Sequence, residues 1–439
     1  MTRSLTPDPI PLDTAADDPV AHGGLGVPEG AALTLGAVLG TGVISLPALA
    51  AHEAGPASLV AWGALVLLSV PLATTFAALG SRFPDGGGVS TYARRAFGAR
   101  VATVIGWCFY FAIPLGAPAA AGFAGAYVAD SLGGGRQTQL ATAGLLILAV
   151  AVMNWYGIRV SGRVQLAIAG VLALLLTVAT LVSLPHATTD NLTPFAPHGW
   201  ASIGSAAALL IWAFAGWEVV SSLSAEYRRP HRDIGRATAI ALVVMGVLYL
   251  GVAFATVAVL GARTGKAPLS DLLVLGFGEP ARIVTTVVAV LLSLGAMNAY
   301  FAGSARLGAA LGRDGSLPAW FAHGSTAGAV PRHSLLVVTA GAIGTLVAIA
   351  VTGVQVERTM LLVTGAFSLV YVVGTAAALR LLPRGTWAWR SAAVSVVATL
   401  ALLVVSGKYL LPQLVVGAAA LIWMARTARP AEPAAPAPV

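Results

Sequence analysis

Charged residues are scarce in this chain. Asp, Glu, Lys and Arg make up 10% of its 439 residues, while hydrophobic residues make up 57%. A water-soluble domain carries about 25% charged and about 45–50% apolar residues. The polar side chains are therefore too few to cover a surface in water, which excludes a cytosolic enzyme and a free nucleic-acid-binding protein. The apolar residues suffice for on the order of twelve membrane helices of roughly 20 residues each.

Cysteine is nearly absent and histidine is rare, which excludes two further classes. The single cysteine, Cys108, cannot form an intrachain disulfide, so the chain is not a secreted disulfide scaffold. The 7 histidines fall in predicted loops, tails or helix ends, and the sequence has no Walker-type phosphate loop. We therefore expect no metal, no other cofactor and no use of ATP.

The apolar residues gather in twelve long segments. These run without polar alternation, which disfavours an outer-membrane barrel and predicts an all-α integral membrane protein with twelve transmembrane helices. The predicted segments are 30–52, 57–80, 101–129, 138–156, 163–184, 201–224, 236–261, 281–304, 334–353, 359–381, 388–405 and 409–426. Residues 268–278 are too few to span and predict a small helix in a loop outside the membrane.

The chain is predicted to form one twelve-helix domain, over residues 28–426, between two disordered tails. The tails cover residues 1–27 and 427–439, which are rich in Pro and polar or small residues. If the N-terminus is cytoplasmic, 19 of the 25 Lys and Arg residues fall on the cytoplasmic side. Basic residues collect on that side of membrane proteins, so we expect both termini in the cytoplasm and no nucleic-acid partner despite the net charge of +8.

Two of the predicted helices carry residues that favour a break. The first segment contains Gly40-Thr41-Gly42, and the sixth contains Ala215-Gly216 followed by Glu218. Each glycine disfavours helix by roughly 1 kcal/mol relative to Ala. Irregular backbone within a membrane is tolerated only where it is buried in protein or lines a cavity. The alternative is that these glycines only permit close packing between continuous helices.

The spacing of the two breaks predicts a repeat architecture. Segments one and six stand five apart, as expected for two inverted repeats of five helices, here 30–184 and 201–381, followed by two extra helices in 388–426. In such folds the ends of half-helices bind an anionic group and freed carbonyls bind a cation. A free amino acid supplies both charges.

Motifs spread along the chain resemble those of the amino acid–polyamine–organocation superfamily of transporters, whose core is the LeuT-like 5+5 fold. The chain is similar to this family in the following stretches: Gly40-Thr41-Gly42-Val43-Ile44-Ser45-Leu46-Pro47; Phe83-Pro84-Asp85-Gly86-Gly87-Gly88; Phe214-Ala215-Gly216-Trp217-Glu218, with Glu226 and Pro230-His231-Arg232-Asp233-Ile234; and Arg313-Asp314-Gly315-Ser316-Leu317-Pro318. In the third stretch Arg229 stands where the family usually has Asn.

Segments two and three resemble a narrower branch of that superfamily, the bacterial exporters of methionine and branched-chain amino acids. The resemblance rests on Ser58-Leu59-Val60-Ala61-Trp62, Gly106-Trp107 and the stretch from Ile113 to Ala120. It implies export, but the Arg313–Pro318 stretch fits the wider superfamily better. Import or exchange therefore stays open as an alternative.

The resemblance implies a substrate site at the two breaks. Backbone N–H groups around Gly40, Gly42 and Val43, with the hydroxyl of Thr41, are expected to hold a carboxylate. The carbonyls of Val38, Trp212 and Ala215 are expected to take an ammonium group, with Gly216 at the second break. The candidates for an apolar side-chain pocket are Ile113, Phe214, Trp217 and Met297, for which ordinary packing or lipid contact is the alternative.

Glu218 is the single acid predicted to lie deep in a span. An ionisable residue there is a functional candidate, and desolvation favours the neutral acid, so Glu218 is a candidate proton carrier. The alternative is a permanently protonated structural acid. The family's lysine in segment five, which takes the place of sodium, is missing here. Without other deep charges, we expect a neutral, aliphatic or methionine-like substrate.

Together these features predict a secondary active transporter of neutral amino acids in a bacterial cytoplasmic membrane, with proton-coupled export as the leading mode. A membrane-embedded enzyme would need paired catalytic groups, which the spans do not supply. A non-transporting sensor or a channel is the other alternative, and a channel would need rings of charges or carbonyls. The expected partners are the amino acid, protons and the lipid bilayer; the sequence leaves open whether the protein forms a homo-oligomer.

Overall fold

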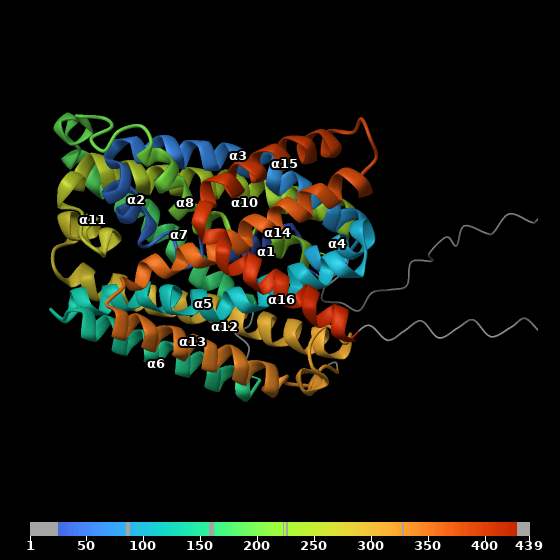
Figure 1. Ribbon diagram of the computed structural model, residues 1–439. Coiled ribbons are helices and arrows are strands. Elements are labelled where there is room, and N and C mark those ends of the chain that lie inside the picture. Colours follow the sequence, from blue (N-terminus) through green and yellow to red (C-terminus); the bar gives the residue numbers. More distant parts are fainter. Residues whose placement is uncertain are drawn as a thin grey trace, which may run out of the picture.

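The computed structural model describes residues 25–84, 88–157, 162–222, 224, 227–326 and 329–427. Every regular element in these ranges is helical, which confirms the all-α prediction (Figure 1). The predicted tails lie almost wholly outside the described residues. The structure begins at Leu25, and its last helix ends at Thr427.

Helices cover all of the predicted apolar segments. Their bounds are α1 (Val27–Leu39), α2 (Leu46–Ala54), α3 (Ser58–Arg82), α4 (Val89–Phe97), α5 (Ala99–Ser131), α6 (Arg136–Trp155), α7 (Gly162–Ser183), α8 (Ser202–Phe214), α9 (Trp217–Ser222), α10 (Pro230–Ala255), α11 (Pro268–Phe277), α12 (Pro280–Arg313), α13 (Arg332–Thr352), α14 (Met360–Leu381), α15 (Trp387–Ser406) and α16 (Leu411–Thr427). Within the described ranges, nine helical stretches are long and apolar enough to cross a membrane; one of them joins α2 to α3 and another joins α15 to α16.

Two departures from the predicted segments share one cause. Helix α10 starts six residues before the predicted 236, and α4 was not predicted at all. Both stretches are amphipathic: α4 buries Val89 and Tyr92 while Arg94 and Arg95 stay exposed. Average hydropathy misses such helices because their polar face cancels the apolar one.

Helix α5 lies at the centre of the bundle. In Figure 1 it runs between α3 and α15 above and α6 and α13 below, and it contacts α6, α12, α13, α14 and α16. Residues 112–126 of α5 are mostly Ala and Gly, and small side chains let neighbouring helices approach closely. By contrast, only 28% of the most apolar part of α13 is buried inside the bundle, as expected for a helix that faces lipid.

A cluster of charges fixes α11 against the ends of α5 and α12. The Arg282 guanidinium lies 2.6 Å from a carboxylate oxygen of Asp130, 3.2 Å from Asp271 and 2.8 Å from Glu279. Burial raises the pKa of the Asp271 carboxyl, and its hydrogen bond from Arg282 opposes that rise. The cluster joins the short helix predicted at 268–278 to two long helices.

We expect Arg282→Gln to loosen this junction. A hydrogen bond to a charged group contributes about 2 kcal/mol, so the variant should melt roughly 2–4 °C below the parent protein. Thermal denaturation of purified protein in detergent measures this. The control is Arg384→Gln, because Arg384 is exposed and forms no ion pair with the described residues. An equal loss of stability in both variants would contradict a specific role for Arg282.

Candidate functional site

Both predicted helix breaks are present. Helix α1 ends at Leu39, the chain turns through 40–45, and α2 begins at Leu46 with Pro47 in its first turn. Proline is favoured there because the first N–H groups of a helix need no intrahelical partner. The second break lies at Ala215–Gly216, between α8 and α9. Gly216 has φ +128°, a conformation that residues with a side chain rarely adopt.

Two glycines let the breaks touch each other. A Cβ atom on Gly216 would lie 3.0 Å from the carbonyl oxygen of Ala37 in α1. A Cβ atom on Gly42 would lie 2.7 Å from the Leu46 side chain and 2.9 Å from the Trp212 ring. Each glycine therefore lacks a side chain at the point where the other broken segment comes close to it.

A small cavity lies between the two breaks, α5, α12 and α14. Its volume is about 50 Å³, which admits a few water molecules at roughly 10–15 Å³ each. A leucine-sized molecule would fit only if lining side chains moved. The cavity is lined by Ala37, Val38, Gly40, Thr41, Gly42, Ala112, Ile113, Gly116, Ala117, Ala120, Trp212, Ala215, Ala296, Met297, Tyr300, Phe301, Val363 and Phe367.

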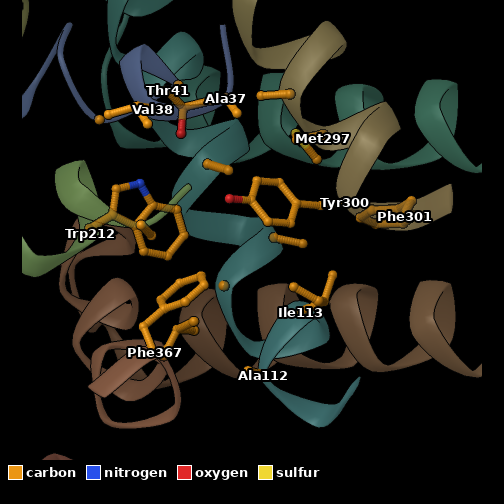
Figure 2. Close-up of a pocket in the computed structure, with 18 residues that line it drawn as sticks. Ala37, Val38, Thr41, Ala112, Ile113, Trp212, Met297, Tyr300, Phe301 and Phe367 are labelled. Atoms are coloured by element: carbon orange, nitrogen blue, oxygen red, sulfur yellow. The ribbon is translucent and has the colours of Figure 1, made fainter. Parts of the chain in front are cut away.

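The cavity wall is almost entirely apolar. Figure 2 shows the hydroxyls of Thr41 and Tyr300 directed into the space beside the Trp212 ring. No charged side chain is among its lining residues. Such a wall suits an uncharged aliphatic group, and any charged group of a ligand must be met by backbone atoms and hydroxyls at the breaks.

The structure places eight of the predicted site residues on this cavity. They are Val38, Gly40, Thr41, Gly42, Ile113, Trp212, Ala215 and Met297. Val43 and Trp217 are fully buried and do not line it, and Gly216 packs behind it on α1. The side chain of Phe214 lies outside the described part of the structure.

The sequence did not indicate ten of the eighteen wall residues. Tyr300, Phe301, Val363 and Phe367 come from two helices with no unusual motif. On α5 a signal was available, because Ile113, Ala117 and Ala120 recur at helical spacing along one face and two of them are small. Small residues on one face indicate either close packing or a cavity, and only the fold decides which.

Side chains satisfy backbone groups that the breaks set free. The Tyr249 hydroxyl on α10 lies 2.7 Å from the carbonyl oxygen of Val38 and 3.0 Å from that of Ala213. The Tyr127 hydroxyl donates to the carbonyl of Ile44, at 2.5 Å. The Val38 carbonyl, predicted to hold a ligand ammonium, therefore already accepts one hydrogen bond.

Glu218 lies beside the second break and not on the cavity wall. Its side chain is 6% exposed. Its Oε2 accepts hydrogen bonds from the backbone N–H of Gly216, at 2.9 Å, and from the hydroxyl of Tyr371, at 2.8 Å. Its Oε1 is buried and has no hydrogen-bond partner among the described residues. Because Oε2 is occupied by two donors, Oε1 is the atom on which a proton would sit.

A wider cavity of about 490 Å³ opens on the α2 side of the breaks. His52, Lys266 and Arg358 stand exposed on its wall, while Ser45 on the same wall is buried in the first break. Both cavities are lined by the first break, α8 and α14. On each of these elements, the residues that line one cavity lie only two or three positions from residues that line the other. We refer to it as the outer funnel.

The opposite end of α1 is closed. Leu25 forms a parallel β-bridge with Tyr227, and the Arg228 N–H donates to the Leu25 carbonyl at 3.1 Å. Gly30 lies directly beneath the Tyr227 ring, where any Cβ atom would collide with that ring. The chain that follows α9 thus covers the start of α1.

Comparison with known proteins identifies the family. The profile described as Amino acid permease matches residues 25–429. The chain belongs to the amino acid permease family. This family is part of the amino acid–polyamine–organocation superfamily, so the protein is a multi-pass membrane transporter and not an enzyme.

Three relatives place the permease more closely. It is 33% identical to the uncharacterized amino acid permease YecA of Bacillus subtilis, over 90% of this chain and 94% of that protein. It is 36% identical to the L-methionine/branched-chain amino acid exporter YjeH of Escherichia coli, over 64% of this chain and 68% of that protein. It is 27% identical to the branched-chain amino acid permease BcaP of Bacillus subtilis, over 72% of each chain.

Gly42→Leu should abolish transport while leaving membrane insertion intact. The new side chain would collide with Leu46 and Trp212 and fill the space between the breaks. Transport of labelled amino acids by reconstituted protein should fall to the background of empty vesicles. The matched control is Gly170→Leu, because Gly170 is exposed on α7 and a Cβ atom there would have no other atom within 4 Å. Normal transport by the Gly42→Leu variant would show that the substrate does not pass between the two breaks.

Proposed function

We propose that the permease is a secondary active transporter of neutral amino acids with aliphatic or methionine-like side chains. The observation that carries this proposal is the cavity between the two helix breaks, whose lining includes no charged side chain. A cationic or anionic amino acid would bring a side-chain charge into this space without a partner, which costs several kcal/mol. The names of the relatives YjeH and BcaP agree with branched aliphatic substrates.

The substrate's own charges would be met at the breaks. The N–H groups near Gly42 and the Thr41 hydroxyl would hold the carboxylate, because the first N–H groups of a half-helix lack intrahelical partners. The Ala215 and Trp212 carbonyls at the end of α8 would take the ammonium. Ile113, Met297 and Phe367 would surround the side chain.

Alternating access would depend on the difference between the two sides of the breaks, one of which is open and the other closed. In the proposed topology α1–α2 and α8–α9 each form one discontinuous span, giving twelve spans with a LeuT-like 5+5 core and both termini in the cytoplasm of a bacterium. The outer funnel then faces outward, and the Leu25–Tyr227 bridge closes the cytoplasmic side. Opening inward would require that bridge to separate.

Glu218 would couple this motion to protons. Its Oε2 binds the Gly216 N–H at the second break and the Tyr371 hydroxyl on α14. Its unpartnered Oε1 can gain or lose a proton without breaking either bond. The carboxylate holds both donors more strongly than the neutral acid does, so proton release would tighten the break and proton uptake would loosen it.

Export is the proposed direction, with import or exchange as the alternative. The relatives that cover the chain include both an exporter and permeases. Proteoliposomes containing the purified protein test substrate and direction together. Labelled methionine, leucine, lysine and glutamate are offered with and without a pH gradient of either sign. Transport of lysine or glutamate at the rate of leucine would refute the substrate assignment, and failure to move any amino acid would refute the proposed function.

Glu218→Gln should separate proton coupling from substrate binding. The amide keeps the shape of the protonated acid and can still accept from Gly216 and Tyr371. Flux driven by a pH gradient should fall to the background of empty vesicles. Exchange of labelled for unlabelled leucine should persist and lose its pH dependence.

The control for this variant is Asp190→Asn, an exposed acid in the loop after α7. It should keep both the gradient-driven flux and the pH profile of the parent protein. If Glu218→Gln also keeps both, Glu218 is a structural acid, and the proton must travel by another group or not at all.

A further inference from the structure

A third cavity, of about 950 Å³, lies where α4 ends, α5 begins and α16 ends, beside the loop that follows α12. Figure 1 shows α4 and the last turns of α16 at the same end of the bundle. This cavity shares no lining residue with the small cavity between the breaks or with the outer funnel. We refer to it as the interfacial cavity.

Arginines give the interfacial cavity a positive charge. Arg94 and Arg100 line it, and Asp314 is the one acid among its described lining residues. The Asp314 carboxylate lies 3.1 Å from the Arg94 guanidinium and 3.6 Å from that of Arg313, so its charge is shared between two arginines. Three arginines minus one carboxylate leave a local charge of +2, which favours an anionic ligand.

Arg100 is the arginine that is ready to bind such a ligand. It is exposed on the cavity wall, and it forms no hydrogen bond or ion pair with any residue that the structure describes. All five of its N–H donors are therefore available. A guanidinium group presents these donors in a planar fork that matches two oxygens of a phosphate. Beside it, the hydroxyls of Thr103 and Ser316 lie 3.0 Å apart on the same wall.

The other half of the wall is apolar and continues onto the outer surface of α16. Leu317, Leu421 and Met424 line it. Leu421 is also 51% exposed, and Leu414, two turns earlier on the same face of α16, is 60% exposed. A free phosphate ion would gain nothing from such a wall. A phospholipid joins a phosphate to acyl chains, so it would use the arginines and the apolar surface of α16 together.

The position of the cavity also fits a lipid headgroup. The long apolar helices α5, α12 and α16 begin or end beside it, which places it near one surface of the membrane. The indole N–H of Trp423 on its wall donates to the Gly315 carbonyl at 3.3 Å. Tryptophan is enriched at the boundary between lipid and water, where its ring is apolar and its N–H is hydrogen-bonded.

We propose that the interfacial cavity binds the phosphate group of an anionic phospholipid, with Arg100 as the phosphate ligand and the acyl chains along α16. This inference goes beyond the proposed function, since it does not depend on which substrate is moved. Only the choice of leaflet follows from the proposed topology, which places the cavity at the cytoplasmic surface. Basic pockets between membrane helices on that side bind anionic headgroups in other proteins.

The first test compares lipids that differ in net charge. Delipidated protein in detergent is titrated with dioleoyl phosphatidylglycerol or dioleoyl phosphatidylcholine, whose choline group cancels the charge of its phosphate. A ligand of the folded protein raises its melting temperature. At roughly tenfold above the midpoint of the titration, we expect phosphatidylglycerol to raise it by about 2 °C more than phosphatidylcholine does. Equal effects of the two lipids would overturn the inference.

Inorganic phosphate separates a lipid site from a site for a soluble anion. The same titration with sodium phosphate, against sodium chloride of equal ionic strength, should leave the melting temperature unchanged. A rise equal to that given by phosphatidylglycerol would overturn the inference, because the acyl chains would then contribute nothing to binding.

The second test removes the free guanidinium. Arg100→Gln should weaken the binding of phosphatidylglycerol by roughly tenfold, the effect of losing one hydrogen bond to a charged group. The matched control is Arg384→Gln, which removes the same charge from an exposed position outside the cavity. It should bind phosphatidylglycerol as the parent protein does. Equal weakening in both variants would overturn the inference, since net charge alone would then explain the binding.

A third variant fills the cavity without changing its charge. Ala425 is exposed on the wall, so Ala425→Trp can fold with its new ring in the space for the headgroup. It should keep the melting temperature of the parent protein in phosphatidylcholine and lose the additional rise in phosphatidylglycerol. If that additional rise persists in this variant, the lipid binds elsewhere and the inference is wrong.

These measurements require no transport, so they are independent of the proposed function. If phosphatidylglycerol binds as expected and the protein moves no amino acid, the proposed function fails while the lipid site stands. If the protein moves leucine and the two lipids act alike, the lipid site fails while the proposed function stands.

Discussion

A helix that stops inside a membrane leaves backbone N–H and C=O groups with neither intrahelical partners nor water, and each such group costs several kcal/mol if it stays unpaired. The rest of this structure depends on how that requirement is met at two places. Tyr249 meets it for the carbonyls of Val38 and Ala213, Tyr127 for that of Ile44, and Glu218 for the N–H of Gly216. Tyr249 and Tyr127 belong to helices other than the broken ones, whereas Glu218 lies within the second broken segment itself.

These hydrogen bonds also determine which movements of the helices cost little free energy. A break held by side chains from other helices can exchange one set of partners for another, whereas an unbroken helix would have to lose its own hydrogen bonds. Glycine completes the arrangement, because Gly42 and Gly216 let the two breaks lie in contact. The small cavity between the breaks therefore lies at the part of the bundle that is easiest to rearrange.

The unpaired backbone groups at the breaks also explain why the polar and apolar parts of the cavity wall come from different helices. In the proposed function, backbone groups at the breaks bind the carboxylate and the ammonium that all amino acids share. The cavity-lining side chains of α5, α12 and α14 are apolar, apart from the Tyr300 hydroxyl, and in that proposal they surround the side chain that differs between substrates. Specificity would then follow from the size and polarity of that wall.

The sequence by itself determined the helices and the positions of the breaks. Long apolar segments form helices in any membrane protein, and Gly40-Thr41-Gly42 and Ala215-Gly216 weaken two of them through local backbone preferences. A third of the cavity wall was predictable for the same reason, because residues at a break, such as Thr41 and Trp212, must lie beside one another wherever the breaks meet.

Only the tertiary structure decided what the breaks contact. Tyr249, Tyr300 and Phe367 lie in ordinary apolar helices, and no local pattern marks them. Their roles depend on which faces of α10, α12 and α14 are turned toward the breaks, and packing among all the helices sets those rotations. Trp217 illustrates the reverse, since it adjoins the break in sequence yet packs away from the cavity. Local sequence determines where the backbone is helical or broken. The packing of the helices determines which side chains contact the breaks.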